Sequence, residues 1–222
     1  EAFAQAGDIE YALQICDRIP ETHKRIRARV NIAETLMKRG KSKRALKLLD
    51  EVSEKEKEQM PYPVKITGLY ARLGKYQKGL DLARLGERKD ETVEALAWVA
   101  RVRAENGDMK RATNILSEAV EISLKVEDSF SRGATLSVAA VTWAGAMRAK
   151  NASAILHKAL ELAARIDDPF HREKTLVKLA KICHEAGVSL DGKARRLLQK
   201  VCTCGSTKKK DKPKSEGASA TR

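Results

Sequence analysis

The sequence is poor in aromatic residues and contains no long apolar segment. Only 4% of its 222 residues are aromatic, whereas 33% are charged. So few large side chains suit thin layers of stacked helices better than one thick core. Because no run of about 18 apolar residues occurs, we expect no membrane-spanning segment. The apolar–polar alternation typical of strands is also missing, which favours an all-helical fold.

Cysteine is scarce, and the four cysteines are Cys16, Cys183, Cys202 and Cys204. Their spacing forms no disulfide framework, so we expect reduced thiols and a cytoplasmic protein. Cys183 with His184 and the two C-terminal cysteines are zinc-type ligands, but their spacing matches no closed zinc site. We therefore expect neither a metal nor another cofactor.

Catalytic motifs are missing as well. No glycine-rich phosphate loop follows a strand, and no Gly-x-Ser-x-Gly elbow occurs. The four histidines, His23, His157, His171 and His184, lie near no nucleophile in a recognisable motif. We therefore expect that the chain is not an enzyme.

Glycine, in contrast, recurs at a nearly fixed interval. Gly7, Gly40, Gly74 and Gly107 follow one another at 33, 34 and 33 residues. Each one ends a helical stretch, where a residue without Cβ suits a left-handed turn, and a second helical stretch follows. A small residue stands five positions after each of them: Ala12, Ala45, Gly79 and Ala112. A period of about 34 residues with two helices predicts a helical repeat array.

The later units are longer than the first ones. Residues 112–132 align with residues 152–172 at an offset of 40, which is seven more than 33. Seven residues make about two helical turns, so the apolar face of the second helix would keep its direction. We expect that face to continue through Phe130 and Phe170.

The repeat pattern covers residues 1–201. We expect turns near residues 7, 40, 74, 107, 147 and 187, with Met147 in place of glycine, and a short helix that starts near Pro63. Because Glu1 already lies inside a first helix, we expect the sequence to be cut from a longer protein. Residues 202–222 are small, polar and lysine-rich, which predicts a basic disordered tail.

Two patterns concern the helix ends. Asp168 followed by Pro169 is typical of an N-cap and a first helical turn. Arg25, Arg132 and Arg172 each lie fifteen residues before a turn position. We expect these arginines to cap carbonyl groups or to bridge helices, which is a structural role.

Together these features resemble the tetratricopeptide repeat (TPR) family. Its small residue and glycine of the first helix are matched by Ala33 and Gly40, by Ala100 and Gly107, and by Ala180 and Gly187. The early aromatic residue of that helix and most closing prolines are missing, and the later period is 40, so the resemblance is to a divergent member. It implies an all-α, right-handed α-solenoid of TPR-like helix–turn–helix repeats, in which the first helices line a concave groove that binds protein segments.

By that geometry the groove carries basic and polar residues and one tryptophan. The candidate partner-binding residues are Arg27, Asn31, Lys38, Lys65, Arg72, Trp98, Arg101, Lys174 and Lys181. A basic groove predicts an acidic partner segment, because arginine pairs with carboxylates through two hydrogen bonds. Trp98 would be an anchor of the hot-spot type. The alternative is that these are ordinary solvated residues and that Trp98 packs between units.

A protein–protein interaction scaffold is therefore the expected function. The net charge of +14 leaves a second function open, because a basic excess attracts nucleic acids and other polyanions. The candidate contacts for it are Lys208, Lys209, Lys210 and Lys212. Few aromatic residues are available for base stacking and the period drifts, so we expect a protein or peptide partner ahead of nucleic acid. An architectural spacer is a third alternative, and the oligomeric state stays open.

Overall fold

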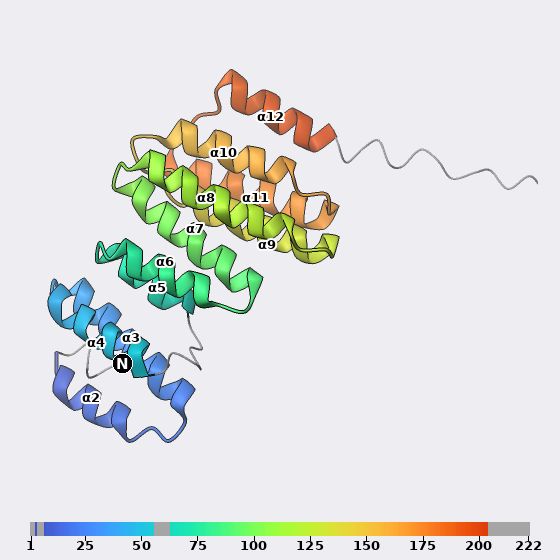
Figure 1. The fold of residues 1–222 in the computed structure, drawn as a ribbon. Helices are drawn as coiled ribbons and strands as arrows, with labels where there is room; N and C mark the ends of the chain where they lie inside the picture. The colour runs from blue at the N-terminus through green and yellow to red at the C-terminus, as the bar shows by residue number, and fades with distance from the viewer. Residues whose placement is uncertain (1–2, 4–6, 56–62, 204–222) are drawn as a thin grey trace, which may run out of the picture.

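The computed structural model describes residue 3 and residues 7–55 and 63–203 of the chain (Figure 1). The described ranges contain eleven α-helices and no strand. The helices are α2 (Ile9–Asp17), α3 (Thr22–Lys38), α4 (Ser42–Lys55), α5 (Pro63–Arg72), α6 (Tyr76–Leu85), α7 (Lys89–Glu105), α8 (Met109–Leu124), α9 (Ser129–Ala144), α10 (Ala152–Ala164), α11 (Pro169–Ala186) and α12 (Gly192–Thr203).

Consecutive helices pack as hairpins, and Figure 1 shows these hairpins stacked in chain order from α2 to α12. The helices α3, α5, α7, α9 and α11 each contact the next one in this series, and we call them the A helices. Their hairpin partners α4, α6, α8 and α10, together with α2, are the B helices. The fold is an all-α solenoid of TPR-like helical hairpins, which confirms the predicted fold class.

The glycine turns repeat one geometry. Gly7, Gly40, Gly74, Gly107 and Gly187 have φ angles between 66° and 111°. In every one of these turns the N–H of the following residue donates to a carbonyl five residues earlier, at 2.8 to 3.0 Å. A side chain in this left-handed region costs about 1–2 kcal/mol, which explains the choice of glycine.

The connection between α9 and α10 is different. Gly145 has a right-handed φ of −59°, and residues 145–151 form consecutive tight turns. Met147 is buried there, with its Sδ 3.6 Å from Cys183 Sγ on α11. A large apolar side chain therefore fills the core where the other units have a glycine turn.

Compared with the unit before it, the unit that begins after Gly107 gains its extra length mainly in its B helix, since α8 has 16 residues and α6 has 10. The prediction that its apolar face continues through Phe130 and Phe170 is wrong, because α8 and α10 end before these residues. Asp128 and Asp168 cap new helices instead, each carboxylate accepting the N–H three residues further on. The two phenylalanines thus belong to α9 and α11, where they are 55% and 59% exposed.

Side chains fix the turns from α2 to α3, from α6 to α7, from α8 to α9 and from α10 to α11. Arg25, Arg132 and Arg172 donate from Nη1 to the carbonyls of Ile19, Val126 and Ile166, at 2.8, 3.1 and 3.3 Å. Thr92 occupies the equivalent sequence position, fifteen residues before Gly107, and its hydroxyl lies 3.4 Å from the Gly86 carbonyl. These bonds confirm the predicted carbonyl-capping role of the three arginines.

The buried apolar side chains form two clusters that meet in the α5/α6 hairpin. One cluster extends from α2 to Ile66 and Tyr70, and the other extends from Ala71 and Leu80 to α12. The Tyr70 hydroxyl also donates to Asp50 at 2.9 Å, and its burial raises the pKa of this phenol above the ordinary value. The α5/α6 hairpin therefore joins the two halves of the core.

The C-terminal end of the described chain is α12, which packs against α10. It ends at Thr203, just beyond the expected boundary at residue 201. Lys208, Lys209, Lys210 and Lys212 lie outside the described residues. Among the residues that the structure describes, no helix is long and apolar enough to cross a membrane.

Candidate functional site

The A helix α7 carries one stripe of polar residues. It consists of Glu91, Glu94, Trp98, Arg101 and Glu105, at three- and four-residue spacing. Most of the remaining surface of α7 is apolar and buried, because α5, α6, α8 and α9 pack around it. The stripe is thus a solvent-accessible surface of α7.

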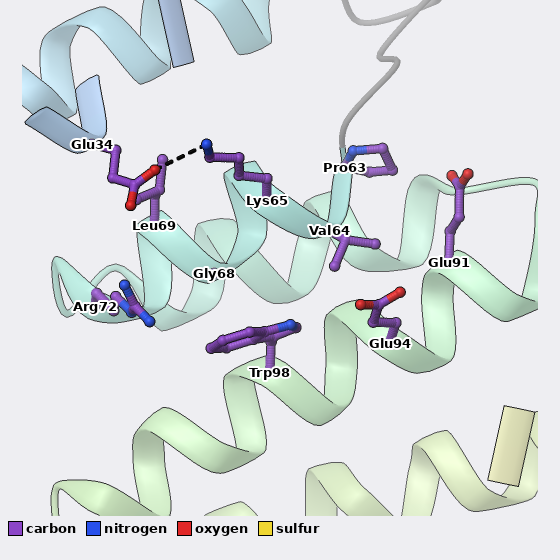
Figure 2. Close-up of a pocket in the computed structure, with 10 residues that line it drawn as sticks. All are labelled: Glu34, Pro63, Val64, Lys65, Gly68, Leu69, Arg72, Glu91, Glu94 and Trp98. Atoms are coloured by element: carbon purple, nitrogen blue, oxygen red, sulfur yellow. Dashed lines mark ion pairs between the residues drawn. The ribbon is translucent and has the colours of Figure 1, made fainter. Parts of the chain in front are cut away.

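A pocket of about 560 Å³ lies between α3, α5 and α7 (Figure 2). Its lining consists of Glu34, Pro63, Val64, Lys65, Gly68, Leu69, Arg72, Glu91, Glu94 and Trp98. Figure 2 shows the indole of Trp98 between α5 and α7, with Arg72 on one side and Glu94 on the other. Gly68 faces the ring, and a Cβ at this position would make an ordinary van der Waals contact with the indole at 4.0 Å.

Two arginines hold the Trp98 ring. The Cζ atoms of Arg72 and Arg101 lie 5.4 and 4.8 Å from the ring centroid, within the range of cation–π attraction. Arg101 also donates from Nε to Glu105 at 2.8 Å. Gly145 permits this position, since a Cβ there would lie 2.5 Å from Arg101 Nη1. Trp98 is partly buried between the units, as the packing alternative expects, and it also lines the pocket.

Two further pockets continue from the first along the A helices. One of about 490 Å³ between α7, α9 and α11 shares Glu94 and Trp98 with it. Another of about 610 Å³ between the beginnings of α7 and α9 shares Glu94 and includes Phe130. We call the surface of these three pockets, which all contain Glu94, the A-helix groove.

The lysines at the α3 side of the groove are engaged by a glutamate. Glu34 lies 2.8 Å from Lys38 Nζ and 2.9 Å from Lys65 Nζ. Lys65 also donates to Asn31 Oδ1 at 2.7 Å. Hydrogen bonds from Lys38 and Lys65 lower the pKa of Glu34 to about 2. These two lysines therefore do not offer the free positive charge that we expected of them.

Glu94 has the opposite environment. No hydrogen bond or ion pair within the described part of the chain involves its carboxylate. Burial raises its pKa first, and the negative charges of Asp90 and Glu91 raise it further. The first pocket contains three glutamates against one lysine and one arginine. The predicted basic groove is therefore wrong at its centre.

The remaining predicted residues lie at the two ends of the A-helix layer. Arg27 is exposed on α3, and Lys174 and Lys181 are exposed on α11. Lys174 Nζ lies 5.5 Å from the Phe170 ring, and Lys181 lies 3.9 Å from Glu185. The structure thus groups Asn31, Lys38 and Lys65 around Glu34, and groups Arg72 and Arg101 around Trp98. It leaves Arg27, Lys174 and Lys181 apart from both groups.

Phe130 is a groove residue that the sequence analysis missed, because its apolar character suggested a buried B-helix face. A signal was present in the sequence. Asp168 before Pro169 marks a helix start, which places Phe170, and by the 40-residue offset Phe130, at the beginning of an A helix.

A second polar cluster lies on the B-helix side. His157 Nε2 is 3.1 Å from Asp191 Oδ1, and the Ser153 hydroxyl lies 3.2 Å from Asp191 Oδ2 and 3.5 Å from His157 Nδ1. Asp191 also accepts the N–H of Ala194 at the beginning of α12. The carboxylate thus caps α12 and ties it to α10. Among the described residues, no group of three or more His, Cys, Asp or Glu side chains could hold a metal.

Comparisons with known proteins returned two solved structures. No protein-family model matches the chain, and no curated protein matches it. A solved chain from Podosopora anserina, described as a kinesin light chain with nearly identical TPR-like repeats, is 20% identical, with a TM-score of 0.39 over 86% of this chain and 100% of that one. A point variant of it is also 20% identical, with a TM-score of 0.40 over 84% and 97%. The fold assignment rests on the hairpins and glycine turns, since these TM-scores are low.

Proposed function

We propose that this chain is a protein–protein interaction scaffold that holds a partner segment in the A-helix groove, with Trp98 as the central anchor. The observation that carries the proposal is the place of this ring. It lines two adjoining pockets and is oriented by Arg72 and Arg101 before any partner arrives. A pre-positioned tryptophan loses little side-chain entropy on binding, which favours affinity.

The charge distribution suggests how a partner would approach. The net charge of +14 would steer acidic proteins toward the chain. Arg27 at one end of the A-helix layer and Lys174 and Lys181 at the other would contact acidic residues of such a partner. We thus propose that the two ends of the partner segment are acidic.

A binding role also fits the histidine cluster on the B-helix side better than a catalytic role does. In a serine hydrolase the histidine lies between the serine and the aspartate and accepts the serine proton. Here the Ser153 hydroxyl lies closer to Asp191 than to His157, and Asp191 is engaged as a helix cap. We therefore propose that the described chain acts by binding and not by catalysis.

Affinity capture with two variants tests this function. Wild type, Trp98→Ala and Leu85→Ala would be used as baits in nuclease-treated lysate at low and high salt, with partners identified by mass spectrometry. Leu85 is a matched control, because it is an apolar side chain that is 60% exposed and lies outside the groove. We expect a discrete protein that survives nuclease and high salt, is lost with Trp98→Ala and is kept with Leu85→Ala. Equal capture by all three baits would contradict the proposal.

Polyanion binding is the second candidate, and a pocket on the B-helix side favours it. This pocket of about 610 Å³ between α8, α10 and α12 contains three lysines, Lys150, Lys158 and Lys193, and one glutamate. Phosphate binding through such residues weakens log-linearly with salt concentration. A partner that is lost on nuclease treatment and shows a steep salt dependence would favour this function over the groove.

A further inference from the structure

Two exposed phenylalanines stack beside the centre of the A-helix groove. Phe130 and Phe170 have ring centroids 6.4 Å apart and planes inclined by only 12°. They are 55% and 59% exposed, although burial of such rings would stabilise the fold. His171 contacts both rings edge-on, with centroids 4.4 and 5.2 Å away. The pair is therefore a pre-formed apolar platform.

The platform adjoins a carboxylate without a partner. Phe130 and Glu94 line the same pocket, together with Glu87 and Asp90. Asp90 is paired with Arg88 at 2.7 Å, whereas Glu94 has no ion pair within the described ranges. Glu94 also lies beside Trp98 in the other two pockets, so it stands between two aromatic surfaces.

Charge complementarity then defines what fits. A half-buried carboxylate that lacks a partner gains most from a cationic hydrogen-bond donor. The aromatic faces on both sides of it would hold the aliphatic stem of a lysine or the plane of an arginine, and a neighbouring apolar side chain. An acidic side chain at this point would add a further negative charge to Glu94 and Asp90.

We propose that the centre of the groove selects a basic residue next to an apolar one in the partner segment. The basic side chain pairs with Glu94, and the apolar side chain covers the Phe130–Phe170 platform. This inference rests on the proposed function, because it requires that a segment binds in the groove. It assigns the middle of the segment a charge opposite to that proposed for its two ends.

Selection from a displayed library of random 12-residue peptides tests the proposal. The baits are wild type, Glu94→Gln, Glu94→Lys and the pair Phe130→Ala and Phe170→Ala, with Trp98→Ala as the test of groove binding. All the changed side chains are at least partly exposed, and Glu94→Gln keeps the shape while it removes the charge. We expect wild type to enrich Lys or Arg at one position and an apolar residue close to it.

The variants should change these preferences separately. Glu94→Gln should lose the basic preference and weaken a selected peptide about tenfold, which is the loss expected for one charge-assisted bond. Glu94→Lys should enrich Asp or Glu at that position, and the phenylalanine variants should lose only the apolar preference. A circular dichroism spectrum equal to that of wild type shows that each variant is folded.

Different results would overturn the basic-residue preference and the groove function. Peptides that depend on Trp98 but show no basic position, or keep it with Glu94→Gln, overturn this inference and leave the groove function intact. Peptides that bind Trp98→Ala as well as wild type, or the absence of any retained peptide, overturn the groove function and this inference together.

Discussion

The ion-pair cluster around Glu34 leads to a prediction that connects the groove to stability. Glu34 on α3 pairs with Lys38 on its own helix and with Lys65 on α5, so it joins two A helices. Its pKa falls from 4.5 to about 2. At about 1.4 kcal/mol per pKa unit, this shift sets a ceiling of roughly 3 kcal/mol.

The measured effect should be smaller than that ceiling. The side chains of Lys38 and Lys65 are 67% and 42% exposed, so water and salt screen both pairs. We expect Glu34→Gln to lower the free energy of unfolding by about 1 kcal/mol at pH 7. For a chain of this size that is roughly 2–4 °C in Tm.

The sign of the pH dependence follows from the direction of the shift. Because the pKa of Glu34 is lower in the folded state, its stabilisation is present above pH 4.5 and is lost as the pH falls toward about 2. Wild type and Glu34→Gln should therefore differ at pH 7 and converge near pH 2.

Urea unfolding followed by circular dichroism at 222 nm, at several pH values, measures this difference. Glu121→Gln is the matched control, because Glu121 is exposed on α8 and takes part in no ion pair among the described residues. A difference between wild type and Glu34→Gln that stays constant from pH 7 to the acid range would refute the reasoning. An equal effect of Glu121→Gln would refute it too, since a general loss of negative charge would then explain the data.

Three further predictions concern the core, the groove glycine and Glu94. Leu116→Asp places an unpaired charge at a fully buried position of α8 and should cost at least about 4 kcal/mol; an unchanged melting curve would show that the repeat register is wrong. Gly145→Ala should displace the Arg101 guanidinium from Trp98, at a cost of about 1 kcal/mol, and shift the Trp98 indole N–H signal in NMR spectra while that of buried Trp143 stays in place. Glu94→Gln should raise the stability at pH 7, because the pKa of Glu94 is raised in the folded state and its ionised form is therefore disfavoured there. This gain in stability should disappear below the unfolded pKa near 4.5, where wild-type Glu94 is protonated in both states. A variant less stable than wild type at pH 7 would contradict the desolvated environment.

The sequence predicts the fold well because its signals are local. The left-handed turns at Gly40 and Gly107 and the caps at Asp128 and Asp168 depend on a few neighbouring residues, so their spacing alone places the helices. The end of α8 was harder to predict, because an apolar residue at the right spacing fits either a continued helix or the start of a new one. Only the Asp cap separates the two alternatives.

The charge of the groove depends on contacts between units and could not be read from the sequence. Lys65 lies 34 residues after Asn31, and its contacts with Asn31 and Glu34 on the neighbouring helix decide whether this lysine is free. The charge of Glu94 likewise depends on contacts between units, because no cationic side chain among the described residues pairs with its carboxylate. A count of basic residues along the A helices gives the right net charge but the wrong local balance.

The A-helix groove repeats in geometry but not in chemistry. Trp98 lies nine residues before its turn position at Gly107. The residues at the same place in the successive A helices are Asn31, Lys65, Trp98, Val138 and Lys178. Packing fills most buried positions with small or aliphatic residues, whereas these groove positions differ in size, polarity and charge. A ligand read by one equivalent residue per repeat, as in single-base recognition of RNA, needs a recurring set of side chains. A groove with a single tryptophan, a half-buried glutamate that lacks an ion pair and a phenylalanine pair at its side fits instead a single segment whose few anchor residues each have one place to bind.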